Sequence, residues 1–354
     1  MVKILIVDDS AFMRNALTSM LSSDPEISIV GTARDGLEAI EKIASLHPDI
    51  VTMDVEMPRM DGLTALRHIM VKTPVPVIML SSLTTDGAKV TLDALDLGAV
   101  DFIPKNLSEL SLNIVKIKEV LIDRIKQIAK KGSIRRPVRH SERAAIESKV
   151  VELHRVMPQR VTGERKTGIV AIGTSTGGPR ALQEVITVLP KDFPVPIVIA
   201  QHMPPNFTGP FAERLNQQSS IEVKEAAEGD ILKPGLVLLA PGRGHMKIVK
   251  KRTLESAVTI SENREEFIYR PSVDALMLSV AECYPGRALG VILTGMGNDG
   301  LKGLTELKRS GGRVFAQNEQ SCVVYGMPKA VVDAGIADKV LSIEEMAGEI
   351  INAV

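Results

Sequence analysis

The chain has 354 residues, of which 43 are Lys or Arg and 43 are Asp or Glu, so its formal net charge is zero. This balance argues against a general nucleic-acid binder, and no apolar run approaches the roughly 18 residues that a membrane span requires. The length suffices for two domains, and the two cysteines, Cys283 and Cys322, lack metal-ligand spacing, so we expect a cytoplasmic protein.

The first part of the chain alternates β-branched runs with segments of helical period. The predicted strands are residues 3–7, 27–30, 49–53, 75–80 and 100–103. The predicted helices are residues 11–21, 36–44, 62–71, 87–97 and one that begins near residue 107. Strands separated by helices require right-handed crossovers, so we expect a five-stranded, doubly wound parallel sheet. Its ligand site should lie beyond the carboxyl ends of the strands.

Polar side chains follow four of these predicted strands. Asp8 and Asp9 follow the first strand, Asp54 the third, Ser81 the fourth and Lys105 the fifth. An Asp pair after a strand is often only a helix cap. Three carboxylates at one edge, however, repel one another unless a divalent cation lies among them, and oxygen ligands suit Mg²⁺. Asp54 would then be a nucleophile toward a phosphoryl group, whose oxygens Lys105 and Ser81 would bind.

The motifs around these residues resemble those of a response-regulator receiver domain, a flavodoxin-like fold. They are Val7-Asp8-Asp9-Ser10, the stretch from Met53 to Gly62, Leu80-Ser81-Ser82, and Lys105. The resemblance implies phosphorylation of Asp54 by a chemotaxis sensor histidine kinase. It also implies that Mg²⁺ is held by Asp9, Asp54 and the main-chain carbonyl of Glu56, with Asp8 acting through water.

Two further positions belong to this resemblance. Phe102 matches an aromatic switch residue whose burial follows the hydroxyl of Ser81. Asn106 stands where the family usually has a proline, so the loop after Lys105 departs from the family pattern.

Basic residues recur between residues 124 and 166, where few apolar residues lie at core spacing. This pattern predicts a basic, partly disordered interdomain linker at 124–166, between a receiver domain at 1–123 and a second domain at 167–354. The positive charge could instead mark a partner-binding segment.

The second domain again alternates strands and helices. Its predicted strands are residues 169–172, 195–200, 236–240, 289–293 and 312–316. Its predicted helices lie near 180–189, 209–217, 273–283 and 300–309, with shorter ones after residues 328 and 343. Residues 224–268 carry turn signals and are predicted to form an irregular antiparallel section. We therefore expect an α/β fold, a doubly wound parallel sheet with an antiparallel portion.

A glycine-flanked serine lies between the first strand and the first helix of this domain. The sequence Gly173-Thr174-Ser175-Thr176-Gly177-Gly178-Pro179 fits a nucleophile elbow, whose following helix aims N–H groups at an oxyanion. The alternative is a phosphate-binding or purely structural glycine turn, because the pattern is short.

The serine needs a base, and this domain contains two histidines. His202 follows an apolar strand, at the rim where such sheets form their sites, and we favour it as the base. His245, between Gly244 and a predicted strand, is the alternative base or else a structural or groove residue.

Asp299 is the predicted orienting acid. It lies in the glycine turn Thr294-Gly295-Met296-Gly297-Asn298-Asp299-Gly300, near a helix N-terminus that would keep it ionised. The alternative is a helix cap without chemistry. The turn also matches G-x-G-x-x-G, but it comes late in the domain and no clear ribose-binding acid closes the following strand, which argues against a dinucleotide site.

The order Ser175, His202, Asp299 differs from that of α/β-hydrolases and of the common proteases. The second domain resembles the catalytic domain of the chemotaxis protein-glutamate methylesterases, the CheB family. The motifs that carry the resemblance are the turn with Ser175, Gln201-His202-Met203-Pro204, Pro271-Ser272-Val273-Asp274 and the Thr294–Gly300 turn. The resemblance implies hydrolysis of glutamate γ-methyl esters, and deamidation of specific glutamines, on methyl-accepting chemotaxis receptors.

From these residues we expect Ser175, deprotonated by His202, to attack the ester without a cofactor, while the N–H groups of Thr176 and Met296 bind the oxyanion. Phosphorylation of Asp54 is expected to uncover the Ser175 cleft. The alternative function is a non-enzymatic response regulator whose output domain binds a partner or DNA. We expect a monomer that does not bind nucleic acid and reaches the membrane only through its receptors.

Overall fold

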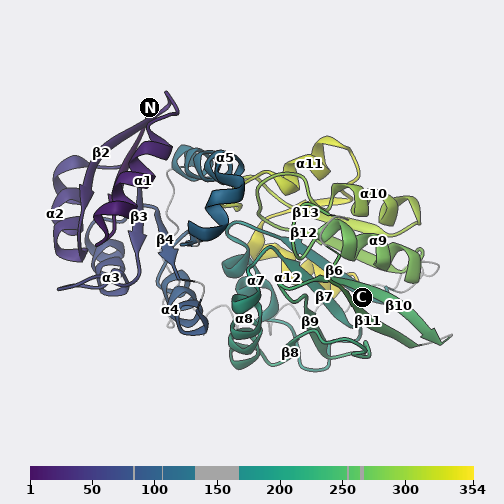
Figure 1. The fold of residues 1–354 in the computed structure, drawn as a ribbon. Coiled ribbons are helices and arrows are strands. Elements are labelled where there is room, and N and C mark those ends of the chain that lie inside the picture. Colours follow the sequence, from purple (N-terminus) through teal and green to yellow (C-terminus); the bar gives the residue numbers. More distant parts are fainter. Residues whose placement is uncertain (83, 106, 132–166, 253–254, 264–266) are drawn as a thin grey trace. The chain divides into compact units, whose positions relative to one another are not determined.

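The structure is a computed structural model that describes residues 1–82, 84–105, 107–131, 167–252, 255–263 and 267–354 (Figure 1). The chain divides into two compact units, Met1–Pro137 and Val138–Val354, and each is described here by itself. The predicted linker beyond residue 131 and the predicted departure at Asn106 lie outside the described residues. Within the described ranges, no helix is long and apolar enough to cross a membrane.

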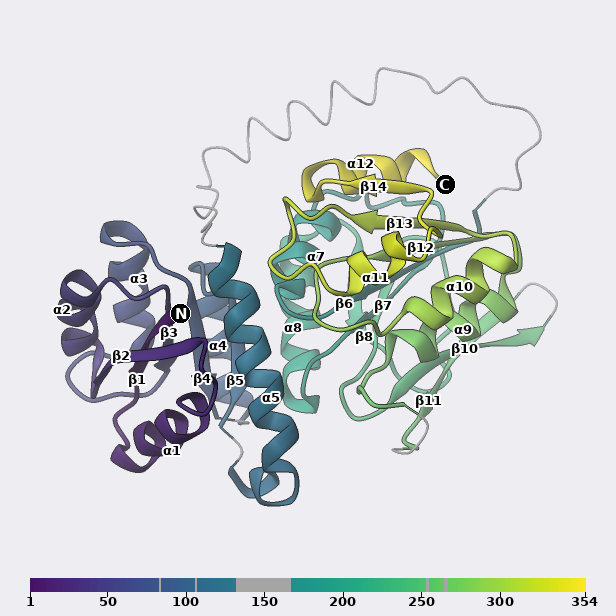
Figure 2. The same cartoon turned by 90° about the horizontal axis from the view of Figure 1, so that it is seen from above.

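The first unit contains a parallel sheet of five strands in the order β2-β1-β3-β4-β5. The strands are β1 (Val2–Val7), β2 (Ile27–Ala33), β3 (Ile50–Asp54), β4 (Val77–Ser81) and β5 (Asp101–Pro104). The helices are α1 (Ala11–Leu21), α2 (Gly36–Leu46), α3 (Gly62–Lys72), α4 (Thr85–Asp96) and α5 (Leu107–Lys131). Helices α1 and α5 pack together on one face of the sheet, and α2 and α3 pack together on the other (Figure 2). This is the doubly wound sheet that the sequence predicts.

Side-chain caps and buried apolar runs account for these elements. Strands β3 and β4 are buried along their whole length because helices cover both faces of the sheet. Four helices begin at residues whose side-chain oxygen accepts an N–H of the first turn, namely Ser10, Asp35, Asp61 and Thr84. The cap of α1 is thus Ser10, and neither Asp8 nor Asp9 serves as one.

Helix α5 runs past the predicted end of the first domain at residue 123. Residues 124–131 were predicted to be linker, but they belong to this helix and include the buried Ile125 and Ile128. These two continue an apolar stripe at helical spacing with the buried Leu121, and α5 contacts α1, β1 and β3.

The second unit contains a parallel sheet of seven strands in the order β14-β13-β12-β6-β7-β9-β8, and a separate antiparallel pair, β10-β11. The strands are β6 (Ile169–Thr174), β7 (Ile197–Gln201), β8 (Glu222–Glu225), β9 (Leu236–Leu239), β10 (His245–Arg252), β11 (Glu255–Ser261), β12 (Ala288–Ile292), β13 (Arg313–Gln317) and β14 (Lys339–Leu341). The helices are α7 (Gly178–Ile186), α8 (Pro205–Gln218), α9 (Val273–Cys283), α10 (Leu301–Arg309), α11 (Met327–Asp333) and α12 (Ile343–Asn352).

Two helical layers cover this sheet (Figure 1). Helices α9, α10 and α11 pack in series, and the β10-β11 hairpin packs on α9; helices α8 and α12 both pack on α7. Strand β6 lies in the middle, with β12 on one side and β7 on the other. The chain therefore changes direction across the sheet at β6, and the carboxyl ends of β12, β6 and β7 meet at one edge.

The structure corrects the prediction for residues 224–268. The antiparallel section consists of β10 and β11, with Ile231 in an antiparallel bridge to Ala257, whereas β8 and β9 are parallel to each other and β9 is parallel to β7. Strands β8 and β14 were not predicted. Both are short edge strands with charged residues, and an edge strand needs no continuous apolar run because one side lies open.

Candidate active site and acidic site

Ser175 directly follows the central strand β6 and is 7% exposed. Its N–H donates to the carbonyl oxygen of Thr294 at 3.0 Å, which continues the pairing of β6 with β12 beyond the strand end. Two residues later Gly177 caps α7 with φ of 76°, and a Cβ at this position would lie 2.6 Å from Val323. The tight turn that the sequence predicts is therefore present, and only glycine suits it.

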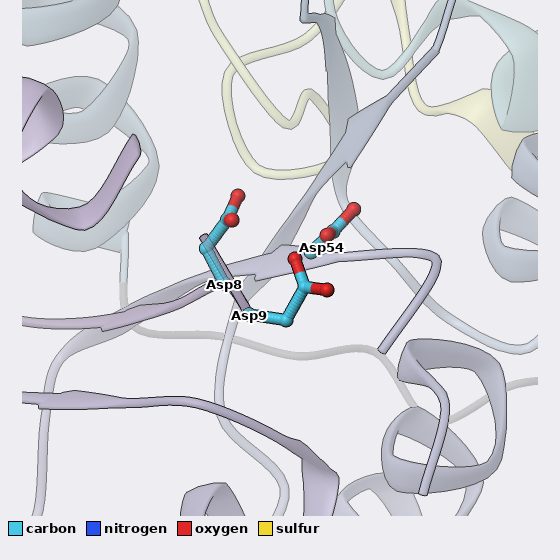
Figure 3. A group of neighbouring side chains, drawn as sticks. All are labelled: Asp8, Asp9 and Asp54. Carbon is cyan, nitrogen blue, oxygen red and sulfur yellow. The ribbon is translucent and has the colours of Figure 1, made fainter. Parts of the chain in front are cut away.

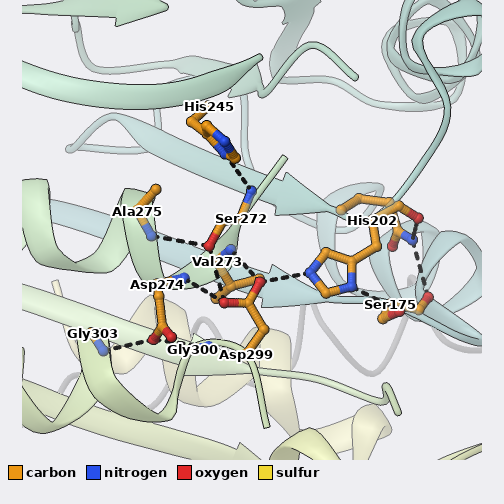
Figure 4. Close-up of polar contacts among 11 residues, drawn as sticks. Ser175, His202, His245, Ser272, Val273, Asp274, Ala275, Asp299, Gly300 and Gly303 are labelled. Carbon is orange, nitrogen blue, oxygen red and sulfur yellow. Dashed lines mark hydrogen bonds and ion pairs between the residues drawn. The ribbon is translucent and has the colours of Figure 1, made fainter. Parts of the chain in front are cut away.

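Ser175, His202 and Asp299 lie together at the carboxyl ends of the three central strands (Figure 4). His202 follows β7, and Asp299 lies between β12 and α10. Oγ of Ser175 lies 3.1 Å from Nδ1 of His202, and Nε2 of His202 lies 2.7 Å from Oδ2 of Asp299. Because a carboxylate only accepts, the neutral imidazole carries its proton on Nε2 and presents the lone pair of Nδ1 to Ser175. The two nitrogens are used in the reverse order from chymotrypsin-like proteases.

The first turn of α9 holds the carboxylate of Asp299. The N–H groups of Val273 and Asp274 donate to it at 2.7 and 3.0 Å, and the hydroxyl of Ser272 donates at 3.0 Å. Burial alone would raise the pKa of Asp299, but the hydrogen bonds from His202 and from these N–H groups lower its pKa below the ordinary value. The N-terminus of a helix therefore favours the ionised form of Asp299, as predicted, although the helix is α9 and not the α10 that follows it in sequence.

Asp274, in the first turn of α9, binds the start of α10 in the same way. Its Oδ1 accepts the N–H groups of Gly300 and Gly303 at 3.0 and 2.8 Å, so α9 and α10 each bind a carboxylate that the other segment supplies. Burial and the nearby charge of Asp299 raise the pKa of Asp274 above its ordinary value. Asp274 thus fixes the turn that carries Asp299.

The structure decides against His245 as the base. Its side chain is fully buried, Nδ1 accepts the N–H of Ser272 at 3.2 Å, and Nε2 lies 3.2 Å from the carbonyl oxygen of Asn263. The residue supports the segment that binds Asp299 and does not line the surface beside Ser175.

Three residues at this site were not singled out from the sequence. The amide of Gln201 donates to the carbonyl oxygens of both Ser175 and His202, at 3.0 and 2.9 Å. The hydroxyl of Thr294 donates to the carbonyl oxygen of Thr176 at 2.9 Å. Tyr269 stacks on His202. Gln201 and Thr294 lie inside quoted motifs, so a signal existed for them, whereas nothing in the pattern around Tyr269 marks it.

Thr176 and Met296, the predicted oxyanion donors, both lie next to Ser175. Thr176 follows it in the chain, and a Cβ on Gly295, the neighbour of Met296, would lie 2.9 Å from Cβ of Ser175. Among the described residues, no acceptor is found for the main-chain N–H of Thr176 or of Met296. Both N–H groups therefore remain candidates for binding an oxyanion.

The first unit brings Asp8, Asp9 and Asp54 together (Figure 3). A carboxylate oxygen from each lies within 4.8 Å of the others. Nζ of Lys105 lies 2.8 Å from Asp8 and 2.6 Å from Asp54. Asp8 and Asp54 thus share one ammonium group, and the oxygen-rich set of three carboxylates fits the preference of Mg²⁺.

The pKa of Asp54 is raised, and its burial is the main cause. Burial raises its pKa from 3.8 to about 6, the charge of Asp8 adds to the rise, and Lys105 only partly opposes it. The N–H of Glu56 donates to Asp54 at 3.3 Å, which places this residue beside the carboxylate.

Ser81 and Phe102 lie on the neighbouring strands. The hydroxyl of Ser81 accepts from the hydroxyl of Thr91 in α4 at 2.6 Å and lies 3.3 Å from the carbonyl oxygen of Gly87, so it is directed toward α4. Phe102 is buried at 6% exposure. Their roles in binding a phosphoryl group and in switching remain predictions.

Comparisons with known proteins match both domains of the chain. The family profile described as CheB methylesterase matches residues 170–350, and that described as response regulator receiver domain matches residues 4–115. The protein-glutamate methylesterase/protein-glutamine glutaminase 2 of Nitratidesulfovibrio vulgaris is 50% identical over 364 residues, which cover 99% of each chain. The protein of that name numbered 1 from Oleidesulfovibrio alaskensis is 51% identical over 100% of each chain.

A solved structure matches the second unit. The crystal structure of the Thermotoga maritima CheB methylesterase catalytic domain is 44% identical, with a TM-score of 0.52, and covers 54% of this chain and 100% of its own.

Proposed function

This chain belongs to the CheB methylesterase family, with a receiver domain ahead of the catalytic domain, and from this premise we propose which residues carry its methylesterase and glutaminase activity. The observation that supports the assignment is the hydrogen-bonded series from Ser175 through His202 to Asp299, at 3.1 and 2.7 Å. The alternative of a non-enzymatic output domain is not favoured by the full-length relatives, which are named as enzymes.

The first half of the reaction forms an acyl-enzyme. Oγ of Ser175 attacks the carbonyl carbon of the γ-methyl ester while its proton passes to Nδ1 of His202. The N–H groups of Thr176 and Met296 donate to the oxyanion of the tetrahedral intermediate. The intermediate collapses as Nδ1 returns the proton to the methoxy oxygen, and methanol leaves. With a glutamine substrate the same proton goes to nitrogen, and ammonia leaves.

The second half releases the product. Water gives a proton to Nδ1 of His202 and attacks the acyl carbon. The bond between this carbon and Oγ of Ser175 then breaks, Oγ takes the proton back from Nδ1, and the glutamate side chain is released. Asp299 stays ionised throughout, stabilises the imidazolium and keeps the proton of the neutral ring on Nε2.

In the receiver domain, the carboxylate of Asp54 is the acceptor of a phosphoryl group from a chemotaxis sensor histidine kinase. Lys105, which already lies between Asp54 and Asp8, remains available to pair with a phosphoryl oxygen. Asp9, Asp54 and the main-chain carbonyl of Glu56 would hold Mg²⁺, with Asp8 acting through water. The cation would neutralise charge during phosphoryl transfer.

The remaining assignments follow from this function. The substrates are glutamyl and glutaminyl side chains of methyl-accepting chemotaxis receptors, and the enzyme works as a monomer in the cytoplasm. The unphosphorylated receiver restrains hydrolysis at Ser175, and phosphorylation of Asp54 relieves this restraint. If an isolated 163–354 fragment were no more active than the unphosphorylated full chain, better positioning of the site would replace this explanation.

The first test is methanol release from methylated receptor membranes, with and without a small phosphodonor and Mg²⁺. Release should rise with the phosphodonor and vanish in Ser175→Ala. Ser310→Ala is the matched control, because it removes only a hydroxyl that bonds the carbonyl oxygen of Glu306 at the end of α10. Full release by Ser175→Ala would refute the triad, and no release from any sample would return the second domain to the binding-module alternative.

A further inference from the structure

The ring of Tyr269 lies on the imidazole of His202. The ring centroids are 4.5 Å apart and the planes differ by 12°. The two hydrogen bonds of His202, to Ser175 and Asp299, attach to the edge of the imidazole, so they do not cover its faces. Tyr269 covers one face, and the side chain of His202 is only 11% exposed. The plane of the imidazole is therefore set by packing as well as by hydrogen bonds.

Tyr269 belongs to the segment that holds the acid of the triad. Three residues after it, Ser272 donates to Asp299, and the next two N–H groups do the same. The base and the acid are thus held by one continuous stretch of chain, 269–274. A displacement of this stretch would move both.

Tyr269 also reaches the turn that carries a candidate oxyanion donor. A Cβ on Gly297, the residue after Met296, would lie 3.2 Å from the hydroxyl oxygen of Tyr269. The tyrosine ring therefore extends from His202 to the Met296 turn, and it leaves little room for the imidazole to swing toward that turn.

We propose that Tyr269 is a positioning residue for the hydrolytic reaction, whose ring keeps Nδ1 of His202 aligned with Oγ of Ser175. The inference rests on the triad proposed above. A stacked aromatic pair resists tilting of either ring, and a catalytic base must be held within about 10–20° of its productive orientation. The flat face of the Tyr269 ring makes this contact, so phenylalanine at this position should preserve the alignment of His202, whereas an aliphatic side chain should lose it.

The chain offers a matched control two residues away. Phe267 contacts the other histidine of the domain, His245, edge-on, with centroids 5.3 Å apart and 61° between the planes. Phe267→Leu removes an aromatic–histidine contact from the same segment without touching His202. It separates loss of the stack from general loosening of the segment.

The experiment measures the rate at which a fluorophosphonate probe labels Ser175 in the full chain, because this reports activation of the serine without a receptor. Tyr269→Leu should label about tenfold more slowly. Tyr269→Phe and Phe267→Leu should each stay within about twofold of the unmodified protein, since both keep the stack on His202. Tyr269→Met provides the same test if the leucine variant is unstable to heating.

Methanol release then separates positioning from substrate binding. For Tyr269→Leu, kcat should fall by the same factor as the labelling rate, with KM nearly unchanged. The inference is overturned if Tyr269→Leu labels at the normal rate, if Tyr269→Phe is as slow as Tyr269→Leu, if Phe267→Leu slows labelling equally, or if only KM changes. Labelling that survives Ser175→Ala would instead refute the triad itself.

Discussion

Asp54 and Asp299 both lie at the carboxyl side of a parallel sheet, and their pKa values shift in opposite directions. Asp54 is the last residue of β3 and Asp299 lies in the turn that follows β12; both strands flank the point where their sheet changes direction, and both residues are buried. Burial raises the pKa of Asp54 to about 6, whereas the pKa of Asp299, where burial also acts to raise it, is lowered overall by its hydrogen bonds. The position of a carboxylate at the edge of a sheet therefore does not determine the direction in which its pKa shifts.

The number of donors accounts for the difference. Asp299 accepts from His202, from a hydroxyl and from two main-chain N–H groups at the start of α9. Asp54 shares Lys105 with Asp8 and receives one long hydrogen bond from the N–H of Glu56. The difference fits the proposed roles, since a carboxylate that only orients can be fully satisfied, whereas one that accepts a phosphoryl group and binds a cation must keep its oxygens available.

The largest expected effect comes from making Asp299 neutral. Asp299→Asn should lower kcat for methanol release by about 10⁴-fold, because an amide nitrogen facing His202 selects the wrong tautomer. Asp230→Asn is the control, since Asp230 also accepts a main-chain N–H, that of Ala227, in a turn outside the triad. A loss smaller than tenfold would show that the ionised state of Asp299 contributes little.

The corresponding change in the receiver should remove regulation and leave basal catalysis. Asp54→Asn should form no acyl phosphate, detected by mass spectrometry, and its methanol release should not respond to phosphodonor and Mg²⁺. Lys105→Met should also respond less, because it removes the ammonium group that contacts Asp54. Normal stimulation of Asp54→Asn would place the phosphorylation elsewhere.

A smaller effect is expected from Asp274, whose carboxylate accepts N–H groups at the start of α10. Asp274→Ala leaves the N–H groups of Gly300 and Gly303 without their acceptor, so it should lower the free energy of unfolding by about 1 kcal/mol and slow catalysis several-fold. Asp274→Asn keeps one acceptor oxygen and should recover most of both losses. Denaturant titration and methanol release measure the two effects. Equal defects in both variants would contradict the capping role.

The smallest effect is a pH-dependent gain in stability. The pKa of Asp54 is about 6 in the folded state against an ordinary 3.8, so the folded protein binds this proton more tightly than the unfolded chain does. Protonated Asp54 therefore adds most to the free energy of unfolding below about pH 4, and this stabilisation is lost as the pH rises through about 6. Asp54→Asn removes the charge and should therefore raise the unfolding temperature at pH 7.5 in EDTA, with little gain near pH 4. Asp86→Asn, at an exposed position of α4, is the control. A gain that is larger at pH 4 would reverse this sign.

Much of the organisation followed from local sequence patterns. Apolar runs located the central strands, and glycine turns after them located Ser175 and Asp299, because the ends of parallel strands meet at one edge. The same reasoning placed Asp8, Asp54 and Lys105 together. The comparisons with known proteins confirm the family and the fold class that these motifs predict.

Tertiary structure alone decided what surrounds these residues. The short charged edge strands β8 and β14 gain their partner only when the sheet assembles. His245 was the alternative base in sequence, yet its side chain is fully buried and its Nδ1 accepts the N–H of Ser272. The main-chain donors to Asp299 come from the start of α9, and the ring over His202 comes from Tyr269; both are distant in the chain from the residue that they contact. Motifs specify which groups reach the edge of a sheet, whereas pKa values and side-chain orientation depend on contacts between segments that only folding brings together.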